Sequence, residues 1–278
     1  MATCEVCFHH CQLKEGQKGF CGARICKDGK VVSLNYGKIT GMALDPIEKK
    51  PLQRFYPGSR ILSIGSYGCN LHCPFCQNHE ISWSKEACEN SEAWETISSE
   101  ELLQIALDLQ KRGNIGIAFT YNEPLIGYEF VRDTAKLFRE AELKTALVSN
   151  GTAELPVLQE ILPYIDAMNI DLKGFTDRYY EKILHGNRQQ TMTFIEEAVR
   201  HCHVELTTLI IPDENDGEME MRELSSWVAS LRDDIPLHIS RFFPCFRMTD
   251  RPATDVALIY HLADVAREKL KYVYTGNC

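Results

Sequence analysis

The sequence predicts an α/β protein, namely a partial (β/α)6 barrel preceded by a small N-terminal cysteine-rich metal-binding head. From residue 61 onwards, short apolar runs alternate with amphipathic stretches at helical spacing. This pattern is typical of parallel strands joined by right-handed helical crossovers. The run contains six or seven such units, too few to close an eight-stranded barrel. Before residue 31, four cysteines stand in the spacing C-x2-C-x3-C-x9-C.

The head is predicted to span residues 1–30 and to hold a metal through Cys4, Cys7, Cys11 and Cys21. Both zinc and an iron–sulfur cluster suit four cysteine ligands, and the spacing does not choose between them. His9 and His10 are alternative ligands. A metal-free loop is the weaker interpretation, because so short a segment has no core of its own.

Residues 31–60 are predicted to connect the head to the barrel. A strand is expected near residues 31–34, and the pairs Asp45-Pro46, Lys50-Pro51 and Pro57-Gly58 indicate loops. The segment DPIEKKPLQRFYPGS, rich in charged and aromatic residues, is interpreted as a well-packed surface loop.

Residues 61–278 are predicted to form the barrel. Strands are expected at 61–66, 115–120, 145–149, 167–172, 204–210, 237–240 and 272–274. Helices are expected at 100–112, 125–142, 156–162, 177–184, 193–201, 219–232 and 254–270. Ser98 or Ser99 is a suitable N-cap for the first of these helices, and Gly113 follows its end.

Polar or cysteine-bearing segments follow the predicted strands. They are residues 66–78, 120–124, 149–151, 171–173, 211–213 and 241–247. In β/α barrels the carboxyl ends of the strands share one face, and the active site lies there. We therefore expect these six segments to converge on one face of the barrel.

Three cysteines within the first of these segments have the spacing C-x3-C-x2-C: Cys69, Cys73 and Cys76. Three thiolates this close can hold three irons of a [4Fe–4S] cube and leave the fourth iron open to another ligand. A zinc knuckle completed by His72, or free cysteines, are the alternatives. Zinc structural sites usually take four closed ligands, often as two C-x2-C pairs, so the spacing favours the iron–sulfur interpretation.

The overall composition is that of an ordinary globular protein, with 44% hydrophobic and 25% charged residues. A net charge of −9 argues against a broad nucleic-acid surface. No apolar run approaches the roughly 20 residues that span a membrane, and the N-terminus lacks a signal segment, so a soluble, cytoplasmic protein with no membrane partner is expected. In that setting, metal ligation explains the twelve cysteines better than disulfides.

These motifs resemble the radical S-adenosylmethionine (SAM) superfamily. The longer match resembles the radical SAM protein family of the AmmeMemoRadiSam system, a relative of the pyruvate formate-lyase activating enzymes. The sequence runs that carry this resemblance are CEVCFHHC, GQKGFCGAR, ALDPIEKKPLQRFYPGS, GCNLHCPFCQN, TYNEP, NIDLKGF and SRFFPCF. The resemblance also suggests that ALDPIEKKPLQRFYPGS lies close to the mouth of the cluster site.

The resemblance implies an enzyme in which Cys69, Cys73 and Cys76 hold a catalytic [4Fe–4S] cluster. SAM binds the open iron, one electron cleaves it to methionine and a 5′-deoxyadenosyl radical, and this radical abstracts hydrogen from a substrate. The substrate, a small molecule or a protein, is unidentified. The electron is expected from an external donor such as flavodoxin or ferredoxin. Such an oxidoreductase or lyase is expected to work anaerobically.

The resemblance also implies the residues that contact SAM. TYNEP occupies the place of a glycine-glycine-glutamate motif, so Glu123 matches the residue that holds the SAM amino group, whereas Tyr121 and Asn122 depart from the glycines. Ser149 and Asn150 match a strand-end contact to SAM.

Further contacts follow from the same comparison. Asp171 and Lys173 match a DLK motif in which the lysine meets the SAM carboxylate or ribose, and Phe75 is a candidate neighbour of the adenine. Arg241 and Arg247 are candidate contacts for an anionic substrate, with solvated surface arginines as the equal alternative.

Two other functions compete with this one. The chain could be a glycyl-radical activating enzyme that acts on a partner protein, as the activating-enzyme relatives do. It could also be a non-catalytic iron–sulfur or zinc protein for electron transfer, which would bind metal without binding SAM.

Overall fold

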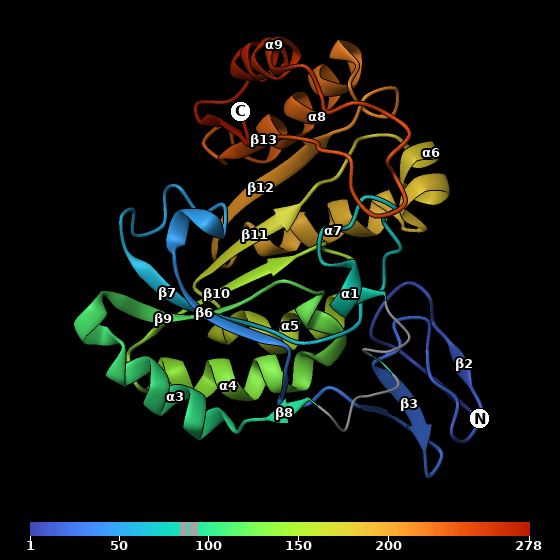
Figure 1. The fold of residues 1–278 in the computed structure, drawn as a ribbon, viewed down its shortest axis with the longest axis vertical. Helices are drawn as coiled ribbons and strands as arrows, with labels where there is room; N and C mark the ends of the chain where they lie inside the picture. The colour runs from blue at the N-terminus through green and yellow to red at the C-terminus, as the bar shows by residue number, and fades with distance from the viewer. Residues whose placement is uncertain (84–87, 89–93) are drawn as a thin grey trace.

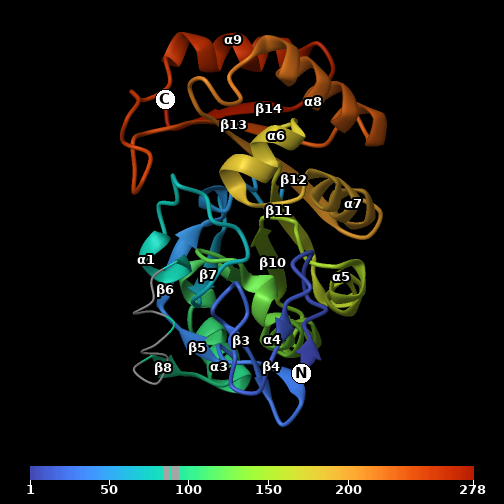
Figure 2. The same cartoon turned by 90° about the vertical axis from the view of Figure 1, so that its right-hand side faces the viewer.

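The computed structural model describes residues 1–83, 88 and 94–278, and these form an α/β fold. Its main sheet has eight strands in the order β14-β13-β12-β11-β10-β9-β7-β6, and the sheet curves into a partial barrel (Figure 1, Figure 2). The predicted fold class is confirmed. None of the helices in the described ranges is long and apolar enough to cross a membrane.

Seven parallel strands make up most of this sheet, and helices connect them in the described part of the chain. The strands are β7 (Arg60–Gly65), β9 (Asn114–Phe119), β10 (Lys144–Ser149), β11 (Ala167–Asp171), β12 (His203–Ile210), β13 (Leu237–Arg241) and β14 (Val273–Gly276). The longer helices are α3 (Ser99–Asp108), α4 (Tyr128–Glu140), α5 (Leu155–Ile161), α7 (Arg188–Ala198), α8 (Glu218–Leu231) and α9 (Val256–Arg267). Shorter helices are α1 (His79–Ser82) and α6 (Asp177–Tyr179), the second continued by a π-helical turn at Tyr180–Leu184.

Helix boundaries follow side-chain caps that the periodicity alone does not locate. Ser98 caps α3 in a capping box with Glu101. Asn187 accepts a hydrogen bond from the Gln190 N–H, so α7 begins at Arg188 rather than near residue 193. Pro124–Gly127 forms a 3₁₀ turn before α4.

Strand β6 (Gly41–Pro46) lies at the edge of the sheet within the range predicted to be a connector. It pairs antiparallel with β7, from Gly41 opposite Gly65 to Pro46 opposite Arg60. The pair Asp45-Pro46, which the sequence predicts to be a loop, belongs to this strand instead. Proline is tolerated there because the strand lies at the edge of the sheet.

The inside of the barrel is filled by a stretch of backbone as well as by side chains. Small residues of three neighbouring strands, Ala118, Ala146 and Ala167, pack against Ile47 and Leu52. We call residues 47–59, which include a 3₁₀ turn at Ile47–Lys49, the plug. Ile47 and Leu52 are fully buried, so this part of the segment lies inside the barrel, whereas residues 56–58 are exposed as a surface loop would be.

Buried polar side chains of the barrel fix the plug. Asn169 of β11 donates a hydrogen bond to the carbonyl of Pro51 at 2.9 Å. Glu205 of β12 accepts from the backbone N–H groups of Gln53 and Arg54 at 3.0 and 2.7 Å. These three backbone groups of the plug have no secondary-structure partner in the described part of the chain, and polar side chains on the inner face of the strands satisfy them, as buried backbone requires.

The N-terminal residues form short strand pairs, β1 (Ala2–Thr3) with β2 (Gln12–Leu13) and β3 (Arg24–Lys27) with β4 (Lys30–Ser33). They lie beside α4 and α5 (Figure 2). The Glu154 N–H donates to the carbonyl of Val6, and Arg24 pairs with Glu129 of α4. A further two-stranded pair joins β5 (Lys38–Ile39) to β8 (Glu95–Thr96).

Candidate functional site

A cavity of about 380 Å³ opens at the carboxyl ends of the parallel strands. Five of the six predicted segments contribute side chains to its wall, and residues 211–213 do not; Thr207 and Leu209 of β12 stand there instead. Two plug residues, Lys49 and Lys50, line the cavity as well, although no chemistry was predicted for them. Other residues that line the cavity are Cys69, Leu71, Cys73, Phe75, Cys76, Trp83, Tyr121, Asn122, Glu123, Ser149, Asn150, Asp171, Lys173, Phe242 and Phe243.

The loop that carries the three cysteines is held by Asn122. Its side-chain amide donates to the carbonyls of Tyr67 and Gly68 at 3.2 and 3.1 Å and accepts from the Ser66 N–H at 3.0 Å. Gly68 has φ +87°, and a Cβ there would lie 2.6 Å from the carbonyl oxygen of Cys21. Only glycine fits that position without displacing the head.

Cys69, Cys73 and Cys76 line the same cavity. Burial raises the pKa of all three thiols, that of Cys73 to about 12 and that of Cys69 well above its usual range. The thiols are therefore neutral without a metal, and metal binding must displace their protons. The Asn150 side-chain amide lies 3.7 Å from the Cys69 sulfur, as a donor to it.

These thiols fit a four-iron cluster better than a single ion. Within residues 1–83, 88 and 94–278, no group of three or more His, Cys, Asp or Glu side chains is arranged to hold one metal ion. In a [4Fe–4S] cube each thiolate binds a different iron, so the sulfurs need not converge on one point. Three thiols of one loop on one cavity wall suit that donor set.

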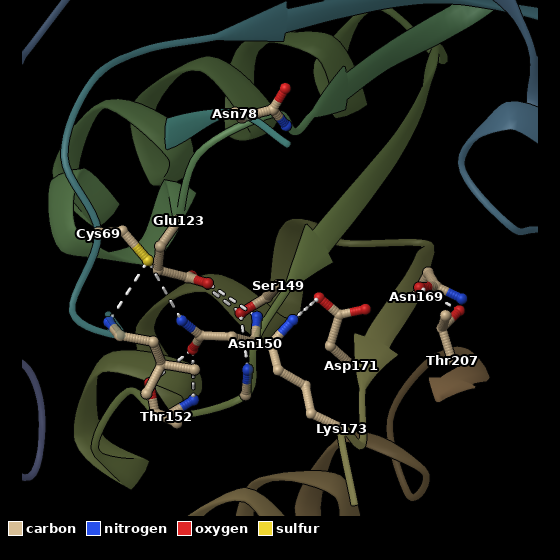
Figure 3. A network of polar contacts seen from close by, with 12 residues as sticks. Cys69, Asn78, Glu123, Ser149, Asn150, Thr152, Asn169, Asp171, Lys173 and Thr207 are labelled. Atoms are coloured by element: carbon tan, nitrogen blue, oxygen red, sulfur yellow. Dashed lines mark hydrogen bonds and ion pairs between the residues drawn. The ribbon is translucent and has the colours of Figure 1, made fainter. Parts of the chain in front are cut away.

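Glu123 follows β9 and is almost completely buried. Its carboxylate accepts hydrogen bonds from the Leu125 N–H at 3.0 Å, the Ser149 hydroxyl at 2.9 Å and the Asn150 N–H at 2.8 Å. Burial raises its pKa to about 7 against the effect of these three donors. Of about four acceptor sites on a carboxylate, three are used, and one remains on Oε2, the oxygen bonded to Asn150. Figure 3 shows Glu123, Ser149 and Asn150 grouped beside Cys69.

Asn150 joins the end of β10 to the cysteine loop. Its amide donates to the Asn70 side-chain oxygen at 2.9 Å, and its own oxygen accepts from the Thr152 hydroxyl. Asn70 in turn donates to Thr152 Oγ1 at 2.8 Å. Sequence reasoning did not single out Asn70 or Thr152, although Asn70 stands directly after Cys69.

Asp171 and Lys173 lie at the end of β11 and form an ion pair of 2.7 Å (Figure 3). Burial alone would lower the pKa of Lys173, but Asp171 outweighs burial and raises it. The Lys173 N–H also donates to the Tyr180 hydroxyl at 3.2 Å, which fixes the backbone of this segment. The lysine is thus a held, permanently charged group on the cavity wall.

Of the three remaining predicted contacts, Phe75 lines the cavity, whereas Arg241 and Arg247 do not. Phe75 is buried and packs with Leu71 and Phe242 at the cavity wall. Arg241 and Arg247 do not line the cavity; their guanidinium groups lie over the rings of Phe243 and Trp83, at 4.7 and 4.9 Å.

The four head cysteines are neighbours in the fold. Burial raises the pKa of Cys7 to about 12 and that of Cys21 to about 11; Cys21 and Cys4 add to the shift of Cys7, and Cys4 adds to that of Cys21. Cys11 lies opposite Cys4, whose N–H donates to the Cys11 carbonyl at 3.0 Å, and the Cys11 sulfur accepts from the Phe20 N–H at 3.5 Å.

Comparison with known proteins agrees with this geometry. The family model of the radical SAM superfamily matches residues 63–224, more than half of the chain. An uncharacterized protein of Methanocaldococcus jannaschii is 37% identical over 99% of this chain and 80% of its own length. The pyruvate formate-lyase-activating enzyme of Clostridium pasteurianum is 27% identical over 64% of this chain and 72% of its own length.

Solved structures share the fold at low identity. Streptococcus suis SuiB bound to S-adenosylmethionine superposes with a TM-score of 0.60 at 12% identity. The match covers 78% of this chain and 52% of SuiB, so the chain spans about half the length of that protein. At this identity the similarity shows the fold alone.

Proposed function

The chain belongs to the radical SAM superfamily, and from this premise we propose that it cleaves SAM reductively and that the resulting 5′-deoxyadenosyl radical abstracts hydrogen from a substrate. The observation that carries the proposal is a juxtaposition. Three thiols of one loop, a buried carboxylate and a held lysine open onto one cavity at the carboxyl ends of the strands.

The family implies a [4Fe–4S] cluster and SAM, and Cys69, Cys73 and Cys76 would hold the cluster as thiolates. When bound, the cluster supplies the single electron that cleaves SAM, received from an external donor of the flavodoxin or ferredoxin kind. Asn150 donates toward the Cys69 sulfur and so stabilises its negative charge. Leu71 and Phe75 of this loop are buried and shield one side of the thiols from water.

Glu123 would bind the amino group of SAM. Its buried carboxylate has one acceptor site left, on Oε2, and an ammonium group is the donor that best offsets a buried negative charge. Ser149 and Asn150 hold the carboxylate in that orientation through the hydroxyl and the backbone N–H.

Lys173 would bind the carboxylate or ribose of SAM, with Asp171 holding its ammonium group in place. Phe75 and its apolar neighbours offer a surface for the adenine ring. The catalytic roles of the chain's own residues are thus to bind, orient and shield the cofactors, whose chemistry is their own.

Two more specific functions are compatible with this chemistry, and they differ in the molecule that the radical attacks. The first, which we propose, is that the chain acts in the AmmeMemoRadiSam system and modifies a substrate there; the sequence runs that resemble that family support it. The second candidate is formation of a glycyl radical on a partner protein, which is favoured by 22–27% identity to pyruvate formate-lyase-activating enzymes. A glycyl radical on the partner gives a doublet in the electron paramagnetic resonance spectrum. Observation of this doublet would support the second function, and its absence would support the first.

The head is proposed to bind a second metal, zinc or an iron–sulfur cluster, through Cys4, Cys7, Cys11 and Cys21. The proximity of Cys4, Cys7 and Cys21 and the pairing of Cys11 with Cys4 support a shared site. Among the described residues no three of these thiols are arranged around one point, so a single metal ion would have to draw them together.

The test is anaerobic reconstitution followed by reduction with dithionite in the presence of SAM. Wild-type protein should form 5′-deoxyadenosine and methionine. Cys73→Ala should abolish product and remove about four irons, because a cube cannot be held by two thiolates. Glu123→Gln should bind SAM at least tenfold more weakly, since the amide carries no charge and one of its two terminal atoms is a donor.

Cys202→Ala is the matched control, because Cys202 lies on the helix side of the barrel, where its thiol donates to the carbonyl of Ala198. It should retain iron and product. Iron bound without SAM binding or cleavage in the wild type would instead establish the electron-transfer alternative. Iron, zinc and sulfide contents of Cys7→Ser, measured in the same series, report on the head: loss of zinc or of a second set of irons supports the second site, and unchanged contents exclude it.

A further inference from the structure

We propose that Lys49 and Lys50 form an anion subsite in the cavity, which binds a carboxylate or phosphate group of the substrate. This inference rests on the proposed function, because it assigns part of the same cavity to the molecule that the radical attacks. The evidence is the placement of two adjacent cations at the cavity wall, Lys50 with its side chain buried and Lys49 with its side chain 67% exposed at the rim.

The two lysines share one carboxylate. Lys50 lies 2.9 Å from Asp45 Oδ2, and Lys49 lies 3.4 Å from Asp45 Oδ1. The Tyr121 hydroxyl also donates to Asp45 Oδ2 at 2.9 Å. Asp45 is thus occupied by two better-placed partners, and the charge of Lys49 is only weakly compensated.

Lys50 is an unusual residue in this wall because its side chain is only 3% exposed. Its ammonium group lies 4.6 Å from the centre of the Tyr121 ring. Burial and the neighbouring charge of Lys49 both lower the pKa of Lys50, and Asp45 opposes them. A second anion beside the pair would relieve the repulsion between the two lysines.

The fold holds this pair firmly. The backbone of the plug is fixed by Asn169 and Glu205 on the inner face of the barrel, and Ile47 packs against the small side chains of the strands. Tyr121 adopts φ +74°, a left-handed conformation that is unfavourable for a residue other than glycine. That conformation accompanies the contact of its hydroxyl with Asp45.

SAM does not account for the pair. In the proposed function its amino group is assigned to Glu123 and its carboxylate or ribose to Lys173, both from the strand ends beside the thiols. Lys49 and Lys50 come from the plug instead and have no cofactor group assigned to them. The remaining occupant of the cavity is the substrate, and two cations select for a negative group on it.

The experiment measures binding of two small anions, inorganic pyrophosphate and glutarate, to reconstituted protein saturated with SAM, by calorimetry at constant ionic strength. Wild-type protein should bind at least one of them, and the tighter one identifies phosphate or carboxylate as the preferred group. Lys49→Glu should weaken that binding at least tenfold, whereas Lys49→Arg should retain it within about threefold. Thermal denaturation of each variant establishes that it is folded.

Lys30→Glu is the charge-matched control, because Lys30 is exposed on β4 in the N-terminal residues. It should leave anion binding unchanged. Absence of binding by the wild type, equal binding by Lys49→Glu, or equal loss in Lys30→Glu would each overturn the subsite. Formation of 5′-deoxyadenosine by the same wild-type samples is measured separately, so failure of SAM cleavage contradicts the proposed function and leaves the anion result to be judged by itself.

Discussion

Glu205 shows how a single buried side chain organises its surroundings. The carboxylate is inaccessible to solvent and has four partners: the N–H groups of Gln53 and Arg54 and the rings of His203 and His238, at 2.9 and 2.7 Å. Burial alone would raise its pKa, but these partners outweigh burial and lower the pKa to about 2. A charged group in this position links strands β12 and β13 to the plug.

This shift predicts a pH-dependent contribution to stability. Because the folded-state pKa lies below the usual value of 4.5, the contribution is fully present above pH 4.5 and is lost as the pH falls toward about 2. The shift corresponds to at most about 3 kcal/mol. In urea unfolding, Glu205→Gln should lower the free energy of unfolding at pH 6, and its difference from wild type should shrink at pH 3.5.

The control for this prediction is Glu140→Gln at the exposed end of α4, which should change stability by less than about 0.5 kcal/mol. A difference between wild type and Glu205→Gln that stays constant from pH 6 to pH 3.5 would contradict the role of the carboxylate charge.

At the scale of elements, the plug depends on small side chains on three strands. Ala118, Ala146 and Ala167 have their side chains inside the barrel, whereas Ile117, Leu147 and Met168 point to the helices, as strand alternation requires. Larger residues at the alanine positions would occupy the volume that now holds Ile47 and Leu52.

We therefore predict that Ala146→Leu destabilises the protein by about 1–3 kcal/mol, the usual range for overpacking a dense core. The change should also displace the plug and so weaken the anion binding attributed to Lys49. Ala257→Leu is the matched control, because that residue is exposed at the start of α9. Chemical unfolding measures the first effect, and equal stability of the two variants would show that the inner volume is not limiting.

At the scale of the whole molecule, the N-terminal residues and the barrel form contacts that tie the head to the site. Arg24 is almost fully buried and donates to Glu129 at 2.7 and 3.0 Å and to the carbonyl of Ile126 at 2.9 Å. A string of ring contacts, His9 on Phe20 and Phe20 on His72, joins the head to the cysteine loop at 4.0 Å each.

We predict that Arg24→Gln loosens the head before the barrel unfolds. Removal of a buried guanidinium costs about 3–5 kcal/mol, and the partial exposure of Glu129 places the expected loss nearer 2–3 kcal/mol. Limited proteolysis should then cut within residues 1–33 faster than in wild type. Arg132→Gln removes two partly exposed ion pairs, one with Asp133 of the same helix and one with Glu160 of α5. It should cost less than about 1 kcal/mol, with the digestion pattern unchanged.

Local sequence patterns are sufficient to predict the barrel and the segments at the carboxyl ends of its strands. Hydrophobic periodicity locates strands and helices, and parallel strands necessarily end at one edge, so the cysteine loop, Glu123 and the Asp171–Lys173 pair could be expected to meet. These inferences need only local patterns and the handedness of the crossovers.

The content of the barrel and the remaining wall of the cavity depend on long-range packing and follow from no local pattern. Strand β6, the plug, the Asn70–Asn150 contact and the lysine pair depend on partners far away in the chain; Glu205 and Gln53, for example, are 152 residues apart. The plug has no period of its own, and its proline and charged residues favour a surface loop when considered locally. Its place is set by the room that three alanines leave and by buried groups that satisfy its backbone, neither of which a local pattern contains.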